Sequence, residues 1–432
     1  MAGMAHATTR ASLPSIVLLT ILVGIHPAAA VSGELTLAAR QADFREFVAD
    51  FTDNYAWLDR AEKPWLTWPE RFAGAVAAAD TPESFAAVLE AALDELHDFH
   101  AEVRSHNPHR WLPVPTFADI WAEPAGEEAR VIAVRHGSDA DRAGVIPGDT
   151  LTHVGHEPLA NAIAARLTGA VDGQDAHSRS WALLSLLAGR ADEERRFTLR
   201  DVRGHSRVVT LPLERRFDRA PGALALQRLP GDMGLIRLNN SLGEQSTVAA
   251  FDHALEQLKG TAGLILDLRD VPSGGNSSVA LGIMGRFVHA LLPYQHHRIP
   301  DYGQGDVERN WLELVAPRGP YTWEAPLVVL VDHWTGSMGE GMAVGLDAMR
   351  RAVVVGTPMA HLAGAVSDFH LPQTGMDVAF ATEQLYHPNG TLRQDWLPPV
   401  LVAEPATDPG DAVLARGLLE LKQLLAPHSP SR

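Results

Sequence analysis

Residues 325–356 read APLVVLVDHWTGSMGEGMAVGLDAMRRAVVVG, and this stretch decides the fold of the chain. Its first part, Leu327 to Val331, is a short run of Leu and Val that predicts one buried β-strand. After a turn, apolar residues recur at helical spacing, namely Met338, Met342, Leu346 and Met349. A second Val-rich run, Ala352 to Val355, predicts another strand. The unit is therefore strand, tight turn, helix and strand, with Ser337 where the turn becomes the helix.

Ser337 occupies a position that has two interpretations. The first N–H groups of a helix have no partner within the helix, and they carry the positive end of its dipole. A serine hydroxyl at this point can attack a carbonyl group while neighbouring N–H groups receive the oxyanion. Serine is also a common helix cap. This stretch alone leaves the catalytic and the structural role of Ser337 open.

Composition sets the class of protein. A chain of 432 residues, 46% of them apolar, is expected to fold into roughly two or three globular domains. Acidic residues outnumber basic ones 53 to 36, and the net charge of −17 argues against a nucleic-acid partner. The sequence contains no cysteine, which excludes a disulfide framework, a thiolate zinc site and a cysteine nucleophile.

The first 30 residues resemble an export signal. Arg10 precedes an apolar segment, Leu13 to Ile25, and Ala28 to Ala30 offers a cleavage site with small residues. The apolar segment is short for a permanent span, although an uncleaved anchor is the alternative. No later segment is apolar enough to cross a bilayer. We expect an exported protein, periplasmic or secreted, whose mature chain begins near Val31 and has no permanent membrane span.

Residues 31–111 are predicted to be a helical N-terminal part. Thr81 followed by Pro82 is typical of a helix start. The apolar stripe that follows reaches Leu96 and leads into residues 97–100, His-Asp-Phe-His. His100 lies just past the predicted helix end, where a side chain can face a cleft. Histidines in such places are also often ordinary surface or core residues.

Residues 112–215 change to a β pattern. Within them, residues 137–159 read GSDADRAGVIPGDTLTHVGHEPL and resemble the core of a bacterial PDZ domain, with Gly144 and Gly148 in its turns and Asp149 before the next strand. Such domains bind an extended peptide at a sheet edge. The alternative is a PDZ-like module that only packs against its neighbour.

Residues 216–432 alternate strands and helices, which predicts an α/β core with parallel strands. A buried-type strand at residues 263–268 leads into a loop with Gly274 and Gly275. Glycine lets backbone N–H groups approach a ligand closely, and open α/β sheets bind ligands at the carboxyl ends of their strands. We therefore expect an oxyanion hole formed by the N–H of Gly274 or Gly275 and that of Met338, with a simple tight turn as the alternative.

Four segments, taken in order, resemble one known family. They are LDELHDFHAEV (93–103), MGLIRLNN (233–240), LILDLRDVPSGGN (264–276) and PLVVLVDHWTGSMGEGMAVGL (326–346). Together they are similar to the C-terminal processing (tail-specific) serine peptidases and the related tricorn protease core. The resemblance implies a fold of the α/β (α+β) class, with a ClpP/crotonase-like peptidase core, an N-terminal helical segment and an inserted PDZ-like β-domain. It also implies that Ser337 is the nucleophile, followed three residues later by Glu340.

The resemblance offers two catalytic styles. One uses a lysine about two dozen residues beyond the serine, but no lysine occurs between Lys259 and Lys422, and the corresponding place is near residues 361–364. The tricorn branch instead takes a histidine from the N-terminal part as its base. By that resemblance His100 is the general base that takes the proton of Ser337.

Two departures from the family leave the acid partner of His100 open. Phe99 stands where the tricorn protease has a serine, and Leu392 or Arg393 stands where it has a late glutamate. Asp395 and Glu340 are the candidates to orient the base or the substrate, and Asp98 is a weaker one.

The sequence predicts no cofactor. It has 20 histidines, two of them adjacent at residues 296–297, but no His-Glu-x-x-His pattern and no phosphate-binding or dinucleotide-binding fingerprint, so no metal is expected. The interpretation is an exported serine-type peptidase that hydrolyses peptide bonds in peptide or protein substrates. The alternative is a non-catalytic ligand- or peptide-binding protein on the same scaffold. The oligomeric state stays open.

Overall fold

A six-stranded sheet forms the centre of the C-terminal half in the computed structural model, which describes residues 35–60, 62–104, 107–167, 175–217, 221–301, 308–403 and 411–426. The predicted signal segment, residues 1–30, lies outside the described residues. In spatial order the strands are β17 (Val400–Leu401), β14 (Val353–Gly356), β13 (Leu327–Val331), β10 (Gly263–Asp267), β9 (Met233–Leu238) and β8 (Leu224–Leu229). All neighbours are parallel except β8 and β9. The parallel sheet confirms the α/β core predicted from the sequence.

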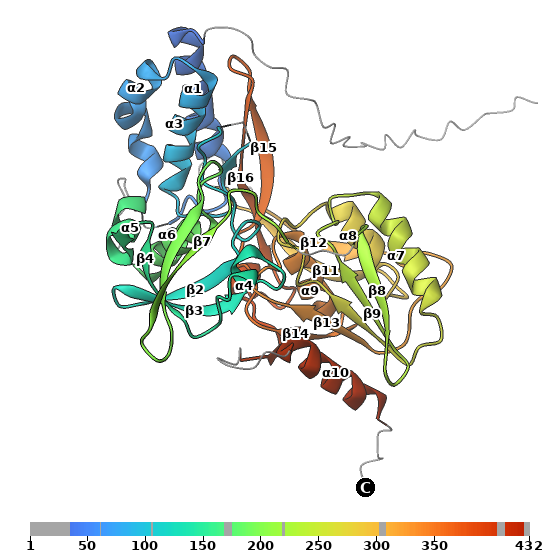
Figure 1. Cartoon of the computed structure of the whole chain (residues 1–432). Helices are drawn as coiled ribbons and strands as arrows, with labels where there is room; N and C mark the ends of the chain where they lie inside the picture. Colours follow the sequence, from blue (N-terminus) through green and yellow to red (C-terminus); the bar gives the residue numbers. More distant parts are fainter. Residues whose placement is uncertain are drawn as a thin grey trace, which may run out of the picture. The chain divides into compact units, whose positions relative to one another are not determined.

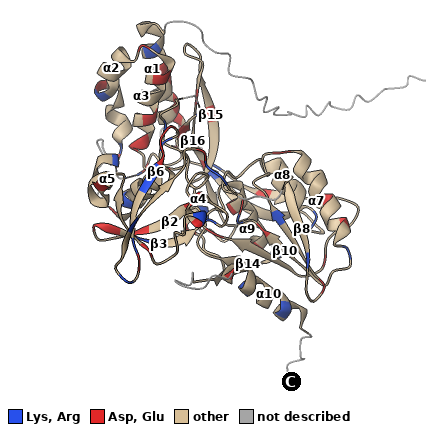
Figure 2. Ribbon diagram, in the orientation of Figure 1, with Lys and Arg blue, Asp and Glu red and all other residues tan. Residues whose placement is uncertain are grey.

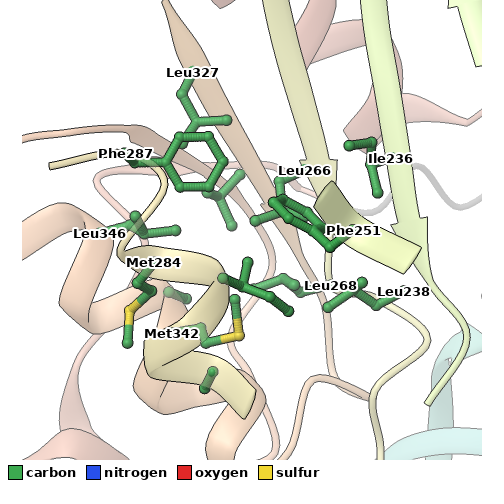
Figure 3. Close-up of a cluster of buried hydrophobic side chains, with 14 of the residues drawn as sticks. Ile236, Leu238, Phe251, Leu266, Leu268, Met284, Phe287, Leu327, Met342 and Leu346 are labelled. Atoms are coloured by element: carbon green, nitrogen blue, oxygen red, sulfur yellow. The ribbon is translucent and has the colours of Figure 1, made fainter. Parts of the chain in front are cut away.

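Both faces of this sheet are covered, because alternate residues of each strand point to opposite sides. One face carries α7 (Ser246–Gln257), α8 (Ser277–Met284) and α9 (Met338–Ala348), and Figure 3 shows the apolar cluster that they form with the strands. The other face packs against α10 (Ala412–Leu425), drawn in red in Figure 1. Every residue of β10 and β13 is buried, which explains the apolar runs at residues 264–266 and at Leu327–Val331.

A second sheet contains long-range pairs that sequence patterns do not reveal. Its strands are β1 (Glu102–Val103), β16 (Met376–Tyr386), β11 (Leu292–Ile299) and β12 (Arg309–Val315), with β15 (Ala365–Leu371) also paired to β16. All of the pairs are antiparallel. Strand β11 packs against α9, and a short 3₁₀ helix, η2 (Arg393–Asp395), also contacts α9. This sheet therefore borders the helix that follows Ser337.

The N-terminal helices pack on the β15–β16 hairpin (Figure 1). They are α1 (Leu37–Asn54), η1 (Pro64–Thr67), α2 (Trp68–Ala78) and α3 (Pro82–Asp94). Thr81 caps α3 by accepting a hydrogen bond from the Ser84 N–H, which confirms the predicted helix start. The helix ends at Asp94, earlier than the apolar stripe suggests, and His97 takes a positive φ of 49°. The chain then leads through His100 into β1 instead of continuing as a helix.

A third sheet lies within residues 112–215. It contains β2 (Ile120–Ala125), β3 (Glu128–Val134), β4 (Thr150–Val154), β5 (Glu157–Pro158), β6 (Arg195–Arg200) and β7 (Ser206–Leu211). The helices α4 (Asp139–Arg142), α5 (Leu159–Arg166) and α6 (Ala176–Ala188) accompany it. Gly144 and Gly148 have φ of 72° and 94°, as their predicted turn positions require. The assignment of this region to the PDZ class stays a prediction.

Charged residues and apolar helices can be located in the structure. Basic residues are spread over the N-terminal helices, the β2–β7 sheet and α10 in Figure 2. Among the described residues, no helix is both long enough and apolar enough to cross a bilayer.

The contact between the N-terminal helices and β16 gives a first prediction. Phe380 is fully buried, and its ring lies 4.4 Å from that of Phe369 and 5.1 Å from that of Phe51. Phe380→Ala should lower the free energy of unfolding by about 3–5 kcal/mol, because removing the ring leaves a cavity between the N-terminal helices and β16. Urea denaturation measures this. The control Leu66→Ala, at a side chain 66% exposed, should stay within about 0.5 kcal/mol of the parent. Equal effects of the two substitutions would contradict this view of the core.

Candidate active site

Ser337 lies in a strained turn between β13 and α9. It is the residue that caps α9, and its φ of 48° and ψ of −112° are unusual for a residue with a side chain. The turn before it is tied to the loop after β10. The Thr335 hydroxyl donates to the Leu268 carbonyl at 3.1 Å, and the Gly336 N–H donates to the Val271 carbonyl at 3.1 Å. These bonds hold the backbone of Ser337 in a conformation that it would not adopt alone.

Glu340 anchors the backbone of Ser337. The Ser337 N–H donates to Oε2 of Glu340 at 2.8 Å, and the Glu340 side chain is only 1% exposed. Burial raises the pKa of this carboxyl group, while Arg393, His361 and the backbone N–H of Ser337 act in the opposite direction. A carboxylate in the first turn of α9 also suits the helix dipole. Glu340 therefore holds the candidate nucleophile, and its carboxylate makes no hydrogen bond to His100 within the described chain.

The glycine loop after β10 lies directly against Ser337. A Cβ atom added to Gly274, whose φ is 63°, would lie 2.4 Å from Ser337 Cβ and 2.9 Å from both Ser337 Oγ and the Met338 nitrogen. A Cβ on Gly275 would instead meet the Leu242 backbone at 2.3 Å. Only glycine fits at either position, so the loop and the start of α9 are in close contact, as expected from the strand order.

The N–H groups distinguish the oxyanion candidates. Gly274 donates its own N–H to the Val271 carbonyl at 3.3 Å. The N–H groups of Gly275 and Met338 donate to no atom in the part of the chain that the structure describes. Of the two glycines predicted as alternatives, Gly275 is therefore the better donor, and Gly274 provides the close approach.

His100 is oriented by a backbone carbonyl. The backbone N–H of His100 donates to the Asp98 carboxylate at 2.9 Å, and that carboxylate also accepts a hydrogen bond from the Tyr55 hydroxyl at 2.9 Å. Nδ1 of His100 lies 3.1 Å from the Ala363 carbonyl oxygen. Because a carbonyl can only accept, Nδ1 carries the proton and Nε2 keeps its lone pair. This is the tautomer that a general base needs.

The surroundings of His100 keep the imidazole neutral. Burial lowers its pKa to about 4, and the Arg393 guanidinium adds to this effect, while Asp98 and the Ala363 carbonyl oppose it. At neutral pH the ring is therefore uncharged, with its proton on Nδ1 and Nε2 as an acceptor. No hydrogen bond joins His100 to the Ser337 hydroxyl in the described ranges, so the catalytic pairing stays a prediction.

Neither candidate acid orients His100 in this structure. Asp395 is exposed at the end of η2, and within the described residues its carboxylate makes no hydrogen bond or ion pair with His100. The Ala363 carbonyl, and not an acid, accepts the hydrogen bond from Nδ1 of His100. Sequence reasoning missed this group because a main-chain oxygen has no side-chain signature. It also missed Arg393, a buried cation that contacts both Glu340 and the segment around Ala363.

The nucleophile turn is also joined to the β2–β7 region. The indole N–H of Trp334 donates to the Ala118 carbonyl at 2.6 Å, and its ring belongs to the apolar core of that region. The ring of His333 stacks on Trp121 at 4.9 Å. On the glycine loop, Asp270 accepts a hydrogen bond from Arg135 at 2.5 Å. Both loops that form the candidate site are thus held partly from outside the α/β core.

The described residues contain no group of three or more His, Asp or Glu side chains placed to bind a metal ion. The groups on the described site are a serine hydroxyl, an imidazole and backbone N–H groups. This donor set is that of acyl transfer through a serine nucleophile.

Solved structures with the same fold include several proteases. The photosystem II D1 C-terminal processing protease matches with a TM-score of 0.53 at 18% identity, covering 85% of this chain and 95% of that one. Mature CPAF matches with a TM-score of 0.57 at 15% identity, covering 90% and 96%. A putative peptidase from Parabacteroides merdae matches with a TM-score of 0.50 at 14% identity, covering 91% and 98%. The predicted fold class is confirmed.

Residues 232–397 match the model of peptidase family S41. This match confirms the resemblance to C-terminal processing serine peptidases that the sequence segments indicated. The matched range includes Ser337, Glu340 and the glycine loop. His100 lies outside it, so its role depends on the geometry described above.

The contact between Gly274 and Ser337 leads to a second prediction. Gly274→Ala should slow the labelling of Ser337 by a fluorophosphonate probe about 100-fold or more, a loss similar to that of an oxyanion donor. The added methyl group must displace Ser337 and Met338, and alanine disfavours φ of 63°. Gly243→Ala is the matched control, because no atom lies within 4 Å of its added Cβ. If the Gly274 variant labelled at the parent rate, this packing would not control the site.

Proposed function

We propose that this chain is an exported serine-type peptidase that hydrolyses peptide bonds through Ser337, with His100 as the general base. One observation carries the proposal. Ser337 is held at a positive φ at the start of α9, against a glycine loop, with the Gly275 and Met338 N–H groups without partners among the described residues. A strained serine at a strand-to-helix turn beside free donors is the arrangement that acyl transfer requires.

The proposed reaction has two acyl-transfer steps. Nε2 of His100 takes the hydroxyl proton of Ser337 while Oγ attacks the carbonyl carbon of the scissile peptide bond. The N–H groups of Gly275 and Met338 stabilise the negative charge that develops on the carbonyl oxygen. The imidazolium returns the proton to the leaving amine, and a water molecule activated by the same base then releases the acyl group. The reaction needs His100 and Ser337 to approach each other when substrate binds.

The substrate class that we propose is a peptide or protein. The region of residues 112–215 would bind or position an extended segment of it, as PDZ-like domains do at a sheet edge. The Trp334 and His333 contacts support such a coupling, because they join this region to the nucleophile turn. Export is proposed from the N-terminal segment alone.

A second function has one observation in its favour. Because Ser337 and His100 share no hydrogen bond within the described residues, a ligand- or peptide-binding protein without turnover fits the same scaffold. A binding protein of this kind would not react with a serine-directed probe, which separates the two functions directly.

The base assignment gives a third prediction. A fluorophosphonate probe should label the purified protein, and both Ser337→Ala and His100→Ala should lose the labelling together with peptidase activity. His361→Ala is the discriminating variant, since His361 is another imidazole close enough to Glu340 to affect its pKa. Loss of labelling in the His361 variant but not in the His100 variant would reassign the base. A folded parent protein that does not label at all would favour the binding function.

The pKa of His100 gives a fourth prediction. Because the folded-state pKa is about 4, below the ordinary 6.5, the ring stays neutral until the pH falls through about 4. The acidic limb of kcat/KM, which reports the free enzyme, should therefore lie well below pH 6.5. Steady-state kinetics with a fluorogenic peptide between pH 3.5 and 8 measures the limb. A limb at pH 6.5 or above would contradict the neutral state of the half-buried His100.

A further inference from the structure

Arg393 is a buried cation behind the candidate site. It begins η2, its side chain is 3% exposed, and η2 packs against α9. Its Nη2 donates to the carbonyl oxygens of Leu362 and Gly364, each at 2.9 Å. The same nitrogen lies 3.9 Å from Oε2 of Glu340. One guanidinium nitrogen therefore faces two main-chain carbonyls and the carboxylate that holds Ser337.

The two carbonyls flank the group that orients the base. Between Leu362 and Gly364 lies Ala363, whose carbonyl accepts the Nδ1–H of His100. The other side of this segment packs on β16, where a Cβ on Gly364 would come within 2.3 Å of the Glu383 carbonyl oxygen. Residues 362–364 are thus fixed between the Arg393 guanidinium and a strand, and the direction of the Ala363 carbonyl is fixed with them.

Arg393 also acts toward the nucleophile. Oxygen Oε2 of Glu340, which Arg393 faces, is the atom that accepts the Ser337 N–H. Glu340 and Arg393 are both buried, and each charge is tolerated there because the other is close. Arg393 therefore contacts both Glu340, which holds Ser337, and the segment whose Ala363 carbonyl holds His100.

We propose that Arg393 is a positioning residue that sets the tautomer and direction of His100 through the Ala363 carbonyl and the backbone of Ser337 through Glu340. This inference depends on the proposed function. Where a serine hydrolase orients its histidine with an acid, the acid also stabilises the imidazolium. Here a neutral carbonyl does the orienting, and a carbonyl orients a ring only when its own direction is held. Arg393 supplies that constraint.

The charge of Arg393 provides a readout that packing alone would not move. The charged groups that act on His100 are Arg393 from η2, Arg104 just after β1, and Asp98 from its own segment. Glu340 from α9 and Tyr294 from β11 face Arg393 in turn. Removing the positive charge of Arg393 removes a group that disfavours the imidazolium, so the pKa of His100 should rise.

The test compares two substitutions of Arg393. Arg393→Lys keeps a positive charge but cannot reproduce the planar guanidinium. Arg393→Lys should lower kcat by about 100-fold, because His100 and Ser337 are then misplaced. KM and the acidic limb of kcat/KM should stay near the parent values. Arg393→Gln should lower kcat at least as much and also move the acidic limb to higher pH. Nitrogen-15 NMR of the His100 ring reports its tautomer and pKa without any need for turnover.

Arg351→Gln is the matched control. Arg351 also binds main-chain carbonyls, those of Phe287, Trp323 and Ala325, but at the opposite end of β13 from Ser337. Its substitution should lower the melting temperature without moving the acidic limb or the His100 tautomer.

The outcomes separate this inference from the proposed function. A Ser337→Ala protein that kept the parent activity would overturn the proposed function, and the positioning role with it. If activity needs Ser337 and His100 but Arg393→Gln keeps the parent kcat, acidic limb and His100 tautomer, the positioning role alone is wrong. It is also wrong if both Arg393 variants only lose stability, as the Arg351 variant does. Should Arg393→Gln fail to fold, Arg393→Lys decides: an unchanged kcat and tautomer would overturn the role.

Discussion

The positive φ of Ser337 is the constraint on which the site depends. A side chain in that region costs about 1–3 kcal/mol, so the surrounding structure must supply the difference. It does so from four sides, through Glu340 at the Ser337 N–H, Thr335 and Gly336 against the loop after β10, and Gly274 in contact with Ser337 itself. The parallel order of β10 and β13 brings these loops together at the carboxyl ends of adjacent strands. The parallel sheet therefore places the two loops that together hold the turn at Ser337.

The parts of the fold that could be predicted are those with local signals. The strand at residues 327–331, the helix after Ser337 and the Thr81 cap follow from periodicity and capping chemistry, and the structure has all three. The β1–β16–β11–β12 sheet could not be predicted in the same way. Its strands are drawn from distant parts of the sequence, and strand pairing depends on which surfaces meet rather than on propensity alone. The early end of α3 at Asp94 has the same origin, because the chain turns there to reach β1.

The residues of the candidate site also differ in whether a local sequence signal could reveal them. Ser337, Met338 and the two glycines carry local signals, since a strand-turn-helix serine and a Gly-Gly loop are visible in the sequence. His100 required the family resemblance, because nothing local distinguishes it from His97. The orienting group could not be found by listing acids. Asp395 is near in sequence to the right place but exposed, while the Ala363 carbonyl lies against His100 through a tertiary contact in a segment that Arg393 also binds.

A carbonyl partner changes how the site would share the catalytic work. An imidazole with a pKa of about 4 is a weak proton acceptor at neutral pH, because the ideal base has a pKa near the working pH. No carboxylate within the described residues binds its Nδ1 to stabilise the imidazolium. More of the barrier must then be lowered by the fixed N–H groups of Gly275 and Met338, which need no reorganisation when charge develops. The rigid hold on Ser337 and the glycine loop, extended by Trp334 into the β2–β7 region, is what such a division of work requires.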